Sequence, residues 1–467
     1  MSEKSKIYRY PGSSPFTREY EKLFFGRDED IARLSTFIRV EKISVLYGKS
    51  GLGKTSLLNA GTLPRLEREH RFLIIPLRFG SFTEETPQYP LDIVKEKLSR
   101  FAKENISGYS PQGSFLNKIE PLNISLWQQC KNMQLALEDG ARIVLVFDQF
   151  EELFTYTDGV DEFAAALADL LYNRMPKNFD AMLRLATRKN PDFLSEEEWK
   201  RLERPVNLKI LMSIRSDKMS QLDSLSSYIP NILHHCYELK PLSRAQAEAA
   251  ITRPADKPFS DDANVAFFSH PFTYTPEALN KILDYLTDNN KKNVESFQLQ
   301  VLCQHVEENI VIKKNTTLVE ETDLGDLPKI YQNYYDHSIA NVGSEQEQKS
   351  ARIFIEEGLI FEEEQRRVSL YEGLIFKKYN ISRELLQKLV NTHLIRAEPS
   401  PTGGFSYELS HDTLVLPILK SKARRTELER KEAERQAAIQ REQKRRKERK
   451  KRLKIIRQRI VAGFSAL

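Results

Sequence analysis

Residues 43–56 read ISVLYGKSGLGKTS, and this stretch decides the fold. Ile43–Tyr47 is a short apolar run, which predicts a buried strand, and a glycine-rich loop follows it directly. Residues 48–55 fit the pattern GxxxxGK[ST], in which glycines let consecutive backbone N–H groups curl around phosphate oxygens. The strand before this P-loop and the helix expected after it give the pattern the context that phosphate binding requires.

Two side chains of the P-loop are expected to act on the phosphates and on a metal ion. Lys54 supplies a point charge to the β- and γ-phosphates, and Thr55 offers its hydroxyl to Mg²⁺. The residues expected to hold the phosphates are Gly48, Lys49, Ser50, Gly51, Leu52, Gly53, Lys54, Thr55 and Ser56.

Four further apolar runs predict the rest of a sheet. They are Phe72–Phe79, Arg142–Phe147, Leu208–Arg215 and the weaker Cys236–Lys240. Long helical stretches separate them, which is typical of a largely parallel sheet with helices on both faces. The sequence therefore predicts an α/β P-loop NTPase fold of the AAA+/ASCE type, in which the mostly polar residues 175–205 form an insertion.

Charged residues stand where two of these strands end. Asp148 follows the third strand, where a carboxylate can hold Mg²⁺ through water. Glu151 and Glu152 come just beyond it, and we expect one of them to orient the attacking water, with Glu152 as the first choice. Arg215 closes the fourth strand, at the end of the sheet where a parallel α/β fold places its ligand, and can bind a γ-phosphate bidentately. The alternative is a surface arginine paired with Asp217.

The strand pattern stops after residue 255, and helical periodicity takes over. Near Asn380 the pattern changes to a helix followed by two strands, IRAE and FSYEL, which is typical of a winged helix. The expected parts are an N-terminal arm (1–25), a nucleotide-binding domain (26–255), a helical domain (256–342), a winged helix (343–420) and a basic helical tail (421–467).

Charge is distributed unevenly along the chain. The net charge is +5, but residues 421–460 contain 18 Lys and Arg against 6 Glu and carry +12, which leaves −7 for the rest. An acidic body argues against nucleic acid as its partner. The three cysteines form no CxxC pair and there is no apolar run of 18 residues, so we expect a cytoplasmic protein.

Several motifs, taken in order, resemble those of the STAND ATPases. They are FFGRDEDIARL (24–34), GKSGLGKTSLLNAGTLPRL (48–66), VFDQFEELF (146–154), SIRSD (213–217), LKPLS (239–243) and TRPA (252–255). These ATPases are signal-transducing switches related to NACHT and NB-ARC proteins. The chain is most similar to the bacterial novel STAND group, over residues 10–420.

The resemblance implies roles for four residues outside the P-loop. Gly26 and Arg27 would lie near the adenine–ribose end of the nucleotide, and Pro254 would pack on the adenine. Ser410-His411-Asp412 resembles the Met-His-Asp motif, whose histidine contacts the β-phosphate of ADP and latches the closed state. The alternative for His411 is a histidine that only caps or packs the start of a helix.

The resemblance also implies a function. The chain would be an ATP- and ADP-binding switch in a bacterial defence or signalling pathway, held closed by ADP, assembling with ATP, and hydrolysing ATP slowly with Mg²⁺. Self-association and an unknown trigger would activate it. An effector or sensor would lie in a partner protein or in a C-terminal extension, such as a transmembrane helix or a WD-repeat propeller, because the apolar ending IVAGFSAL suggests a fragment. Residues 444–459 would contact an anionic membrane, unless this segment is only a solvated spacer.

Two other functions stay open. A DNA-organising ATPase such as a helicase loader also combines a P-loop sheet, a helical lid and a winged helix, and the basic tail could grip phosphates. Such ATPases normally carry Asn or Thr in place of Arg215 and an adjacent Asp-Glu in place of Asp148-Gln149. A scaffold that does not hydrolyse ATP is the third interpretation, which would require Glu151 and Glu152 to be dispensable.

Overall fold

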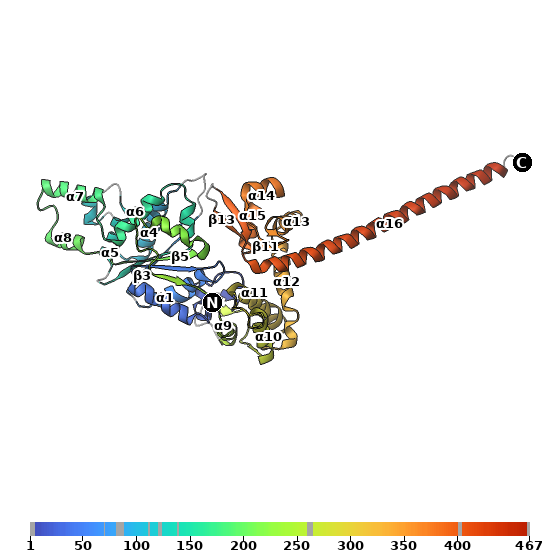
Figure 1. The fold of residues 1–467 in the computed structure, drawn as a ribbon, viewed down its shortest axis with the longest axis horizontal. Coiled ribbons are helices and arrows are strands. Elements are labelled where there is room, and N and C mark those ends of the chain that lie inside the picture. Colours follow the sequence, from blue (N-terminus) through green and yellow to red (C-terminus); the bar gives the residue numbers. More distant parts are fainter. Residues whose placement is uncertain are drawn as a thin grey trace.

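A computed structural model describes residues 5–69, 71–80, 88–110, 113–119, 124–137, 140–258, 265–399 and 404–464 (Figure 1). Its central element is a five-stranded parallel sheet in the order β3-β4-β5-β2-β6. The strands are β2 (Ile43–Gly48), β3 (Phe72–Leu77), β4 (Arg142–Phe147), β5 (Leu208–Arg215) and β6 (Cys236–Glu238). The expected parallel sheet with helices on both faces is confirmed.

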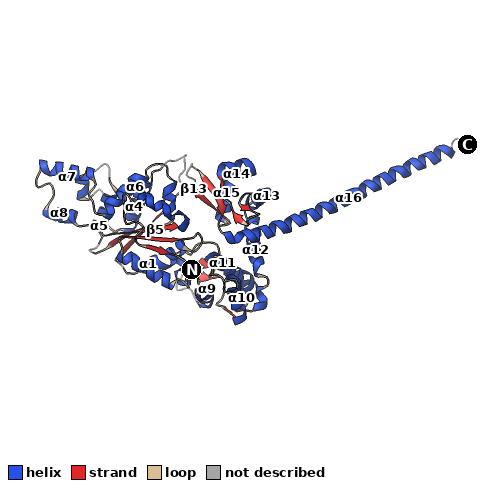
Figure 2. Cartoon of the chain, in the orientation of Figure 1, coloured by secondary structure: helices blue, strands red, loops and turns tan. Residues whose placement is uncertain are grey.

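Helices cover both faces of this sheet, which explains why its strands are continuous apolar runs (Figures 1 and 2). One face carries α1 (Asp28–Val40) and the unbroken helical run of α2 (Lys54–Ser56), η2 (Leu57–Thr62) and α3 (Leu63–Glu67). The other face carries α4 (Pro90–Asn105), α5 (Leu126–Ala136) and α6 (Val160–Leu171). Residues 175–205 form α7 (Lys177–Lys189) and α8 (Glu196–Glu203), whose apolar faces join the same core.

The helical part begins earlier than the sequence suggested. It consists of α9 (Arg244–Asp256), α10 (Pro276–Leu286), α11 (Ser296–Val306) and α12 (Leu327–Ala340). Ala247 and Ile251 of α9 are buried in the same apolar core as α10, α11 and α12. Helix α9, which the predicted boundary at residue 255 assigns to the nucleotide-binding domain, therefore packs with the helices that follow it.

The N-terminal arm is built into this helical part. Strand β1 (Ser5–Ile7) pairs in parallel with β7 (Val265–Phe267). Arg9 is fully buried, and its backbone N–H donates to the carboxylate of Glu307 while its guanidinium donates to the carbonyl of Pro254 at 2.8 Å. The arm thereby continues directly into the region of the P-loop.

Residues 343–420, called the C-terminal module below, contain helices followed by a β-hairpin. The helices are α13 (Glu345–Ile353), α14 (Glu372–Tyr379) and α15 (Arg383–Asn391), and the sheet has the order β12 (Leu370–Tyr371), β14 (Phe405–Leu409), β13 (Ile395–Pro399). The helix and hairpin lie where the sequence placed them. The apolar core of this module is continuous with that of α9–α12, so the boundary at residue 342 marks no break in packing.

Short elements complete the described chain. They are the strands β8 (Thr273–Tyr274), β9 (Leu318–Val319), β10 (Ile360–Phe361) and β11 (Arg366–Arg367), and the helical turns η1 (Arg18–Leu23), η3 (Phe115–Lys118), η4 (Phe150–Thr155), η5 (Ser216–Leu225), η6 (Glu307–Ile312), η7 (Glu321–Leu324), η8 (Phe354–Gly358) and η9 (Asp412–Leu414).

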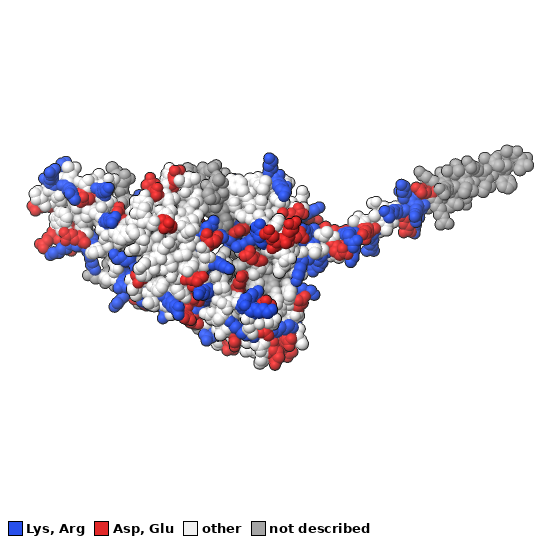
Figure 3. Space-filling model, in the orientation of Figure 1, with Lys and Arg blue, Asp and Glu red and all other residues white. Residues whose placement is uncertain are grey.

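A single long helix, α16 (Val415–Phe464), ends the described chain and leaves the body (Figure 1). Its first turns are buried in the C-terminal module through Val415 and Ile418, and Ser421 and Arg424 bind Asp336 of α12. Beyond them, Lys, Arg and Glu side chains alternate along its described part (Figure 3). Among the described helices, none has a stretch apolar and long enough to cross a bilayer.

Candidate nucleotide-binding site

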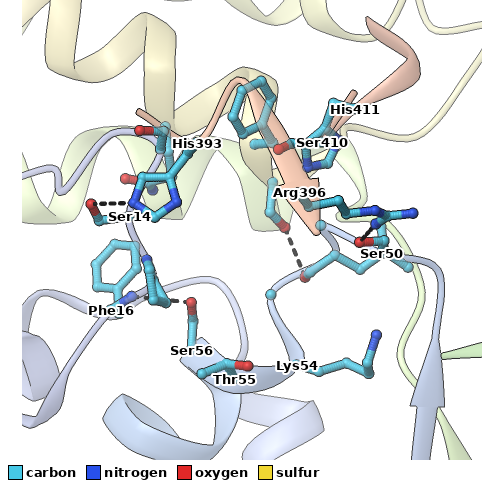
Figure 4. A pocket seen from close by; sticks show the side chains of 18 of the residues that line it. Ser14, Phe16, Ser50, Lys54, Thr55, Ser56, His393, Arg396, Ser410 and His411 are labelled. Carbon is cyan, nitrogen blue, oxygen red and sulfur yellow. Dashed lines mark hydrogen bonds between the residues drawn. The ribbon is translucent and has the colours of Figure 1, made fainter. Parts of the chain in front are cut away.

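A cavity of about 880 Å³ lies where the P-loop, the arm, α11 and the C-terminal module meet. Its walls include residues 50–56 of the P-loop and α2, residues 12–16 of the arm, Phe297 of α11, and Arg396 and His411 of the module (Figure 4). Segments far apart in the sequence therefore enclose one space beside the phosphate-binding loop.

The P-loop presents its lysine to this cavity. Gly51 and Gly53 have φ angles of +80° and +90°, which glycine adopts at little cost, and the loop curls around the start of α2. The ammonium group of Lys54 donates to the carbonyl of Gly48 at 2.8 Å and to that of Lys49 at 3.3 Å. Burial lowers the pKa of Lys54, and the carboxylates of Glu151 and Asp148 oppose that shift. The side chain is thus a partly desolvated cation held inside the loop.

Thr55 and Asp148 form a pair of oxygen ligands beside Lys54. The Thr55 hydroxyl donates to Asp148 Oδ2 at 2.8 Å. Asp148 Oδ1 is buried and accepts no hydrogen bond within the described part of the chain. An orphaned carboxylate oxygen next to a hydroxyl fits Mg²⁺, which prefers hard oxygen ligands. The structure therefore brings together the two residues expected to hold the metal ion.

Glu151 and Glu152 both line the cavity but have different surroundings. Glu152 is buried, and its carboxylate accepts from Arg78 at 2.7 and 2.9 Å and from the backbone N–H of Gly80 at 2.9 Å. Burial raises the pKa of Glu152, while Arg78 and the Gly80 amide oppose the rise. Glu151 is the carboxylate that most favours the charged form of Lys54. One glutamate is thus fixed by Arg78, and its neighbour acts on the phosphate-binding lysine.

Arg215 is the last residue of β5, at the carboxyl end of the strand. Its guanidinium pairs with Asp217 through two contacts of 3.0 and 2.8 Å, so the alternative interpretation describes a real contact. The side chain is nevertheless only 11% exposed and lines the cavity. Its Nη1 atom lies 3.8 Å from Glu408 Oε1 of the C-terminal module. Arg215 therefore belongs to the interface with that module as well as to the sheet.

Of the three residues expected at the adenine–ribose end of the nucleotide, one lines the cavity and two do not. Arg27 lines the cavity, and it donates to the carbonyl of Leu52 at 3.1 Å and to the hydroxyl of Ser296 at 3.2 Å. Gly26 packs against the backbone of α9, where an added Cβ would lie 2.3 Å from the carbonyl oxygen of Gln246. Pro254 is buried within α9 and does not line the cavity.

His411 lies directly over the P-loop. Its ring stacks on Phe297 with centroids 4.1 Å apart and planes 9° apart. A Cβ added to Gly51 would lie 1.7 Å from the imidazole Cε1, so only a glycine leaves room for this ring. Burial, together with the positive charges of Arg396 and Arg367, lowers the pKa of His411 to about 3. The imidazole is therefore neutral and packed between the module, α11 and the P-loop.

Comparison with protein families gives one match, to the model described as Novel STAND NTPase 1, over residues 10–452. The chain belongs to the novel STAND NTPase 1 family. The resemblance seen in the sequence is confirmed, and the chain is a nucleotide-binding P-loop NTPase that hydrolyses nucleoside triphosphates.

Comparison with solved structures gives matches at low sequence identity. The Orc1 protein of Aeropyrum pernix in complex with DNA matches with a TM-score of 0.42 and 13% identity. The match covers 86% of this chain and 93% of the Orc1 chain. A Walker-type ATPase of Pyrococcus abyssi has a TM-score of 0.41 and 14% identity, covering 87% and 98%. The Aeropyrum pernix Orc2 protein in ADPNP and ADP complexes has a TM-score of 0.41 and 13% identity, covering 85% and 94%. No curated protein matches the chain.

Several residues that line the site of this STAND NTPase were not predicted from the sequence. Arg78 follows β3 at the edge of the sheet where Asp148 follows β4, so its position at a strand end was a usable signal. Ser296 and Phe297 begin α11, and Arg396 lies in the hairpin; all three line the cavity, and nothing in the local sequence marks them. Tertiary packing alone brings them to the P-loop.

We expect Glu152→Gln to reduce ATP hydrolysis about a hundredfold or more while ATP still binds, because the variant loses the carboxylate that would orient water. The protein should then remain bound to ATP. Glu151→Gln is the matched control, with the same change of charge one residue away. Single-turnover hydrolysis measures both variants. If Glu151→Gln stops hydrolysis and Glu152→Gln does not, the assignment moves to Glu151.

Proposed function

We propose that this novel STAND NTPase is a signal-transduction switch, closed with ADP and able to assemble with ATP. The observation that carries the proposal is the position of His411, which reaches from the C-terminal module onto Gly51 of the P-loop. We treat this module as a winged helix whose contact with the loop depends on the nucleotide. A change in the phosphates can then be transmitted to a part of the chain more than 350 residues away along the sequence.

Each residue of the site has a role in this proposal. Thr55 and Asp148 would hold Mg²⁺, which supplies charge neutralisation between the β- and γ-phosphates when it is bound. Lys54 binds the same phosphates, Glu152 orients the attacking water, and Arg215 binds the γ-phosphate. His411 contacts the β-phosphate in the ADP state.

The energies indicate why such a switch would need a trigger. Reversing a 99:1 closed population requires about 5.5 kcal/mol of differential binding. One charge-assisted hydrogen bond contributes roughly 1.5–3 kcal/mol, so contacts of Arg215 to the γ-phosphate alone fall short. We therefore propose that an unknown trigger, together with self-association, completes the transition, and that slow hydrolysis resets it.

The setting of the switch is a further part of the proposal. We place it in the cytoplasm, in a bacterial defence or signalling pathway, with its effector or sensor in a partner protein or a C-terminal extension. The alternating charges of α16 support a solvated helix, and its lysine- and arginine-rich end would add affinity for an anionic membrane.

The nucleotide that co-purifies with the full chain tests this function. We expect one tightly held ADP per chain, measured by chromatography of the heat-released nucleotide, and a monomer by light scattering. Exchange for ATP in the presence of the trigger should produce a larger assembly. A site that purifies without nucleotide would contradict the proposal and favour a rapidly cycling motor.

A further inference from the structure

One carboxylate of the C-terminal module faces three arginines beside the P-loop. Glu408 of β14 lies opposite Arg396 of β13 in the hairpin, and its Oε1 atom accepts from Arg396 Nε at 2.8 Å. The same oxygen lies 3.8 Å from Nη1 of Arg215, and Oε2 lies 4.0 Å from Nε of Arg367. Glu408 is 13% exposed, so solvent screens these contacts only in part. Glu408 is therefore hydrogen-bonded to Arg396 and forms longer ion pairs with Arg215 and Arg367.

This cluster borders the place where the phosphates bind. Arg396 donates to the hydroxyl of Ser50 in the P-loop (Figure 4). The positive charges of Arg215 and Arg396 both lower the pKa of Lys54, because all three cations lie near one another. Arg215 reaches the cluster from the end of β5, whereas Glu408 reaches it from the module. The contact between them consequently joins the sheet to the module.

We propose that Glu408 biases the site towards ADP, because a γ-phosphate must displace its ion pair with Nη1 of Arg215. Asp217 binds the Nε and Nη2 atoms of the same guanidinium and leaves Nη1 facing Glu408. The inference rests on the proposed function, in which Arg215 binds the γ-phosphate. A carboxylate and a phosphate are both oxyanions that a guanidinium binds through its N–H groups, so they compete for the same donor. ADP brings no γ-phosphate and leaves the contact intact, whereas ATP must break it.

The position of Glu408 also links this competition to His411. Strand β14 ends at Leu409, and only Ser410 separates that residue from His411. Because a strand is a stiff element, a displacement of Glu408 from Arg215 shifts the segment that carries the imidazole over Gly51. When ATP breaks the ion pair between Glu408 and Arg215, it thus also weakens the contact of His411 with Gly51. Both contacts join the module to the nucleotide-binding domain.

The test is the selectivity of the full chain with Glu408→Gln, which keeps the shape of the side chain and removes its charge. Titration with fluorescent ADP and with a fluorescent, non-hydrolysable ATP analogue gives the ratio of the two dissociation constants. We expect Glu408→Gln to shift this ratio about fivefold towards the ATP analogue, by removing the ion pair that competes with the γ-phosphate for Arg215. In an Arg215→Gln background the same change should shift the ratio less than about twofold, because the competing donor is gone.

Glu362→Gln is the matched control, with the same chemical change elsewhere in the C-terminal module. Glu362 pairs with Lys422 at 2.8 Å and does not line the cavity, so its loss should affect both nucleotides alike and leave the ratio within about twofold. Should Glu408→Gln fail to fold, Glu408→Asp carries the test: it keeps the pair within the hairpin but shortens the reach to Arg215, and a smaller shift in the same direction is expected.

Two results overturn the proposal in distinguishable ways. If Arg215→Gln lowers the preference for the ATP analogue but Glu408→Gln or Glu408→Asp leaves it unchanged, the switch stands and Glu408 only holds Arg396 within its hairpin. If Arg215→Gln itself leaves the ratio unchanged, Arg215 does not bind the γ-phosphate. The proposed function then lacks the contact of Arg215 with the γ-phosphate, and the proposed competition for Arg215 is wrong as well.

Discussion

Lys54→Ala is expected to weaken the binding of both ATP and ADP roughly ten- to a hundredfold and, in the proposed switch, to abolish signalling. Lys54 is the buried cation of the P-loop, and a charge-assisted hydrogen bond contributes roughly 1.5–3 kcal/mol. Loss of its contact with the β-phosphate should affect both nucleotides. Isothermal titration calorimetry with each nucleotide measures the effect.

Lys42→Ala is the control for Lys54→Ala. Lys42 is exposed just before β2, at the opposite end of that strand from the P-loop, so its removal changes the net charge equally without touching the cavity. Its variant should bind both nucleotides as the unchanged protein does. Equal losses in the two variants would show that general electrostatics, rather than the P-loop lysine, dominates nucleotide binding.

In the proposed switch, His411→Ala is expected to activate a part of the protein without the trigger. The substitution removes the stack on Phe297 and the contact over Gly51, which together hold the module on the P-loop. Aromatic stacking contributes about 0.5–1.5 kcal/mol beyond area burial, so we expect the open population to rise about tenfold. Light scattering in ATP without trigger should show assembly. A variant that stays monomeric and silent in ATP would remove His411 from the switch.

His337→Ala is the matched control: His337 is exposed on α12, so its substitution should leave the assembly unchanged.

The pH dependence of the closed state provides a second readout for His411. In the closed state the pKa of His411 is about 3, whereas a solvated imidazole has a pKa of about 6.5, so the open state binds the extra proton. The closed state therefore keeps its stability above pH 6.5 and loses about 1.4 kcal/mol per unit as the pH falls below that value. His411→Ala should abolish this contribution to the pH dependence.

The sequence predicted the nucleotide-binding fold well because its signals are local. An apolar run such as Ile43–Tyr47 must become a buried strand, and the pattern of residues 48–55 has meaning only between a strand and a helix. The neighbours of α9, just before the predicted boundary at residue 255, are not indicated by any local signal. Alanines 247, 250 and 255 of α9 are compatible with several neighbours, and only packing against α10–α12 decides which.

Residues of the site could be predicted where a short sequence motif indicates their chemical role. Asp148, Thr55 and Lys54 stand in motifs that fix their positions relative to one backbone turn. Pro254 was assigned by resemblance alone, and the structure buries it in α9, whereas Ala250 of the same helix lines the cavity.

By itself the sequence determined a parallel sheet, a P-loop with a carboxylate at the end of a neighbouring strand, and a distant His-Asp motif in a helix-and-hairpin segment. Those features depend on periodicity and on short spacings, which the order of residues contains in full. Only the tertiary structure decided that His411 lies on Gly51 and that Glu408 faces Arg215. Such contacts join segments hundreds of residues apart, and they arise from how two apolar cores pack together, which no local pattern encodes.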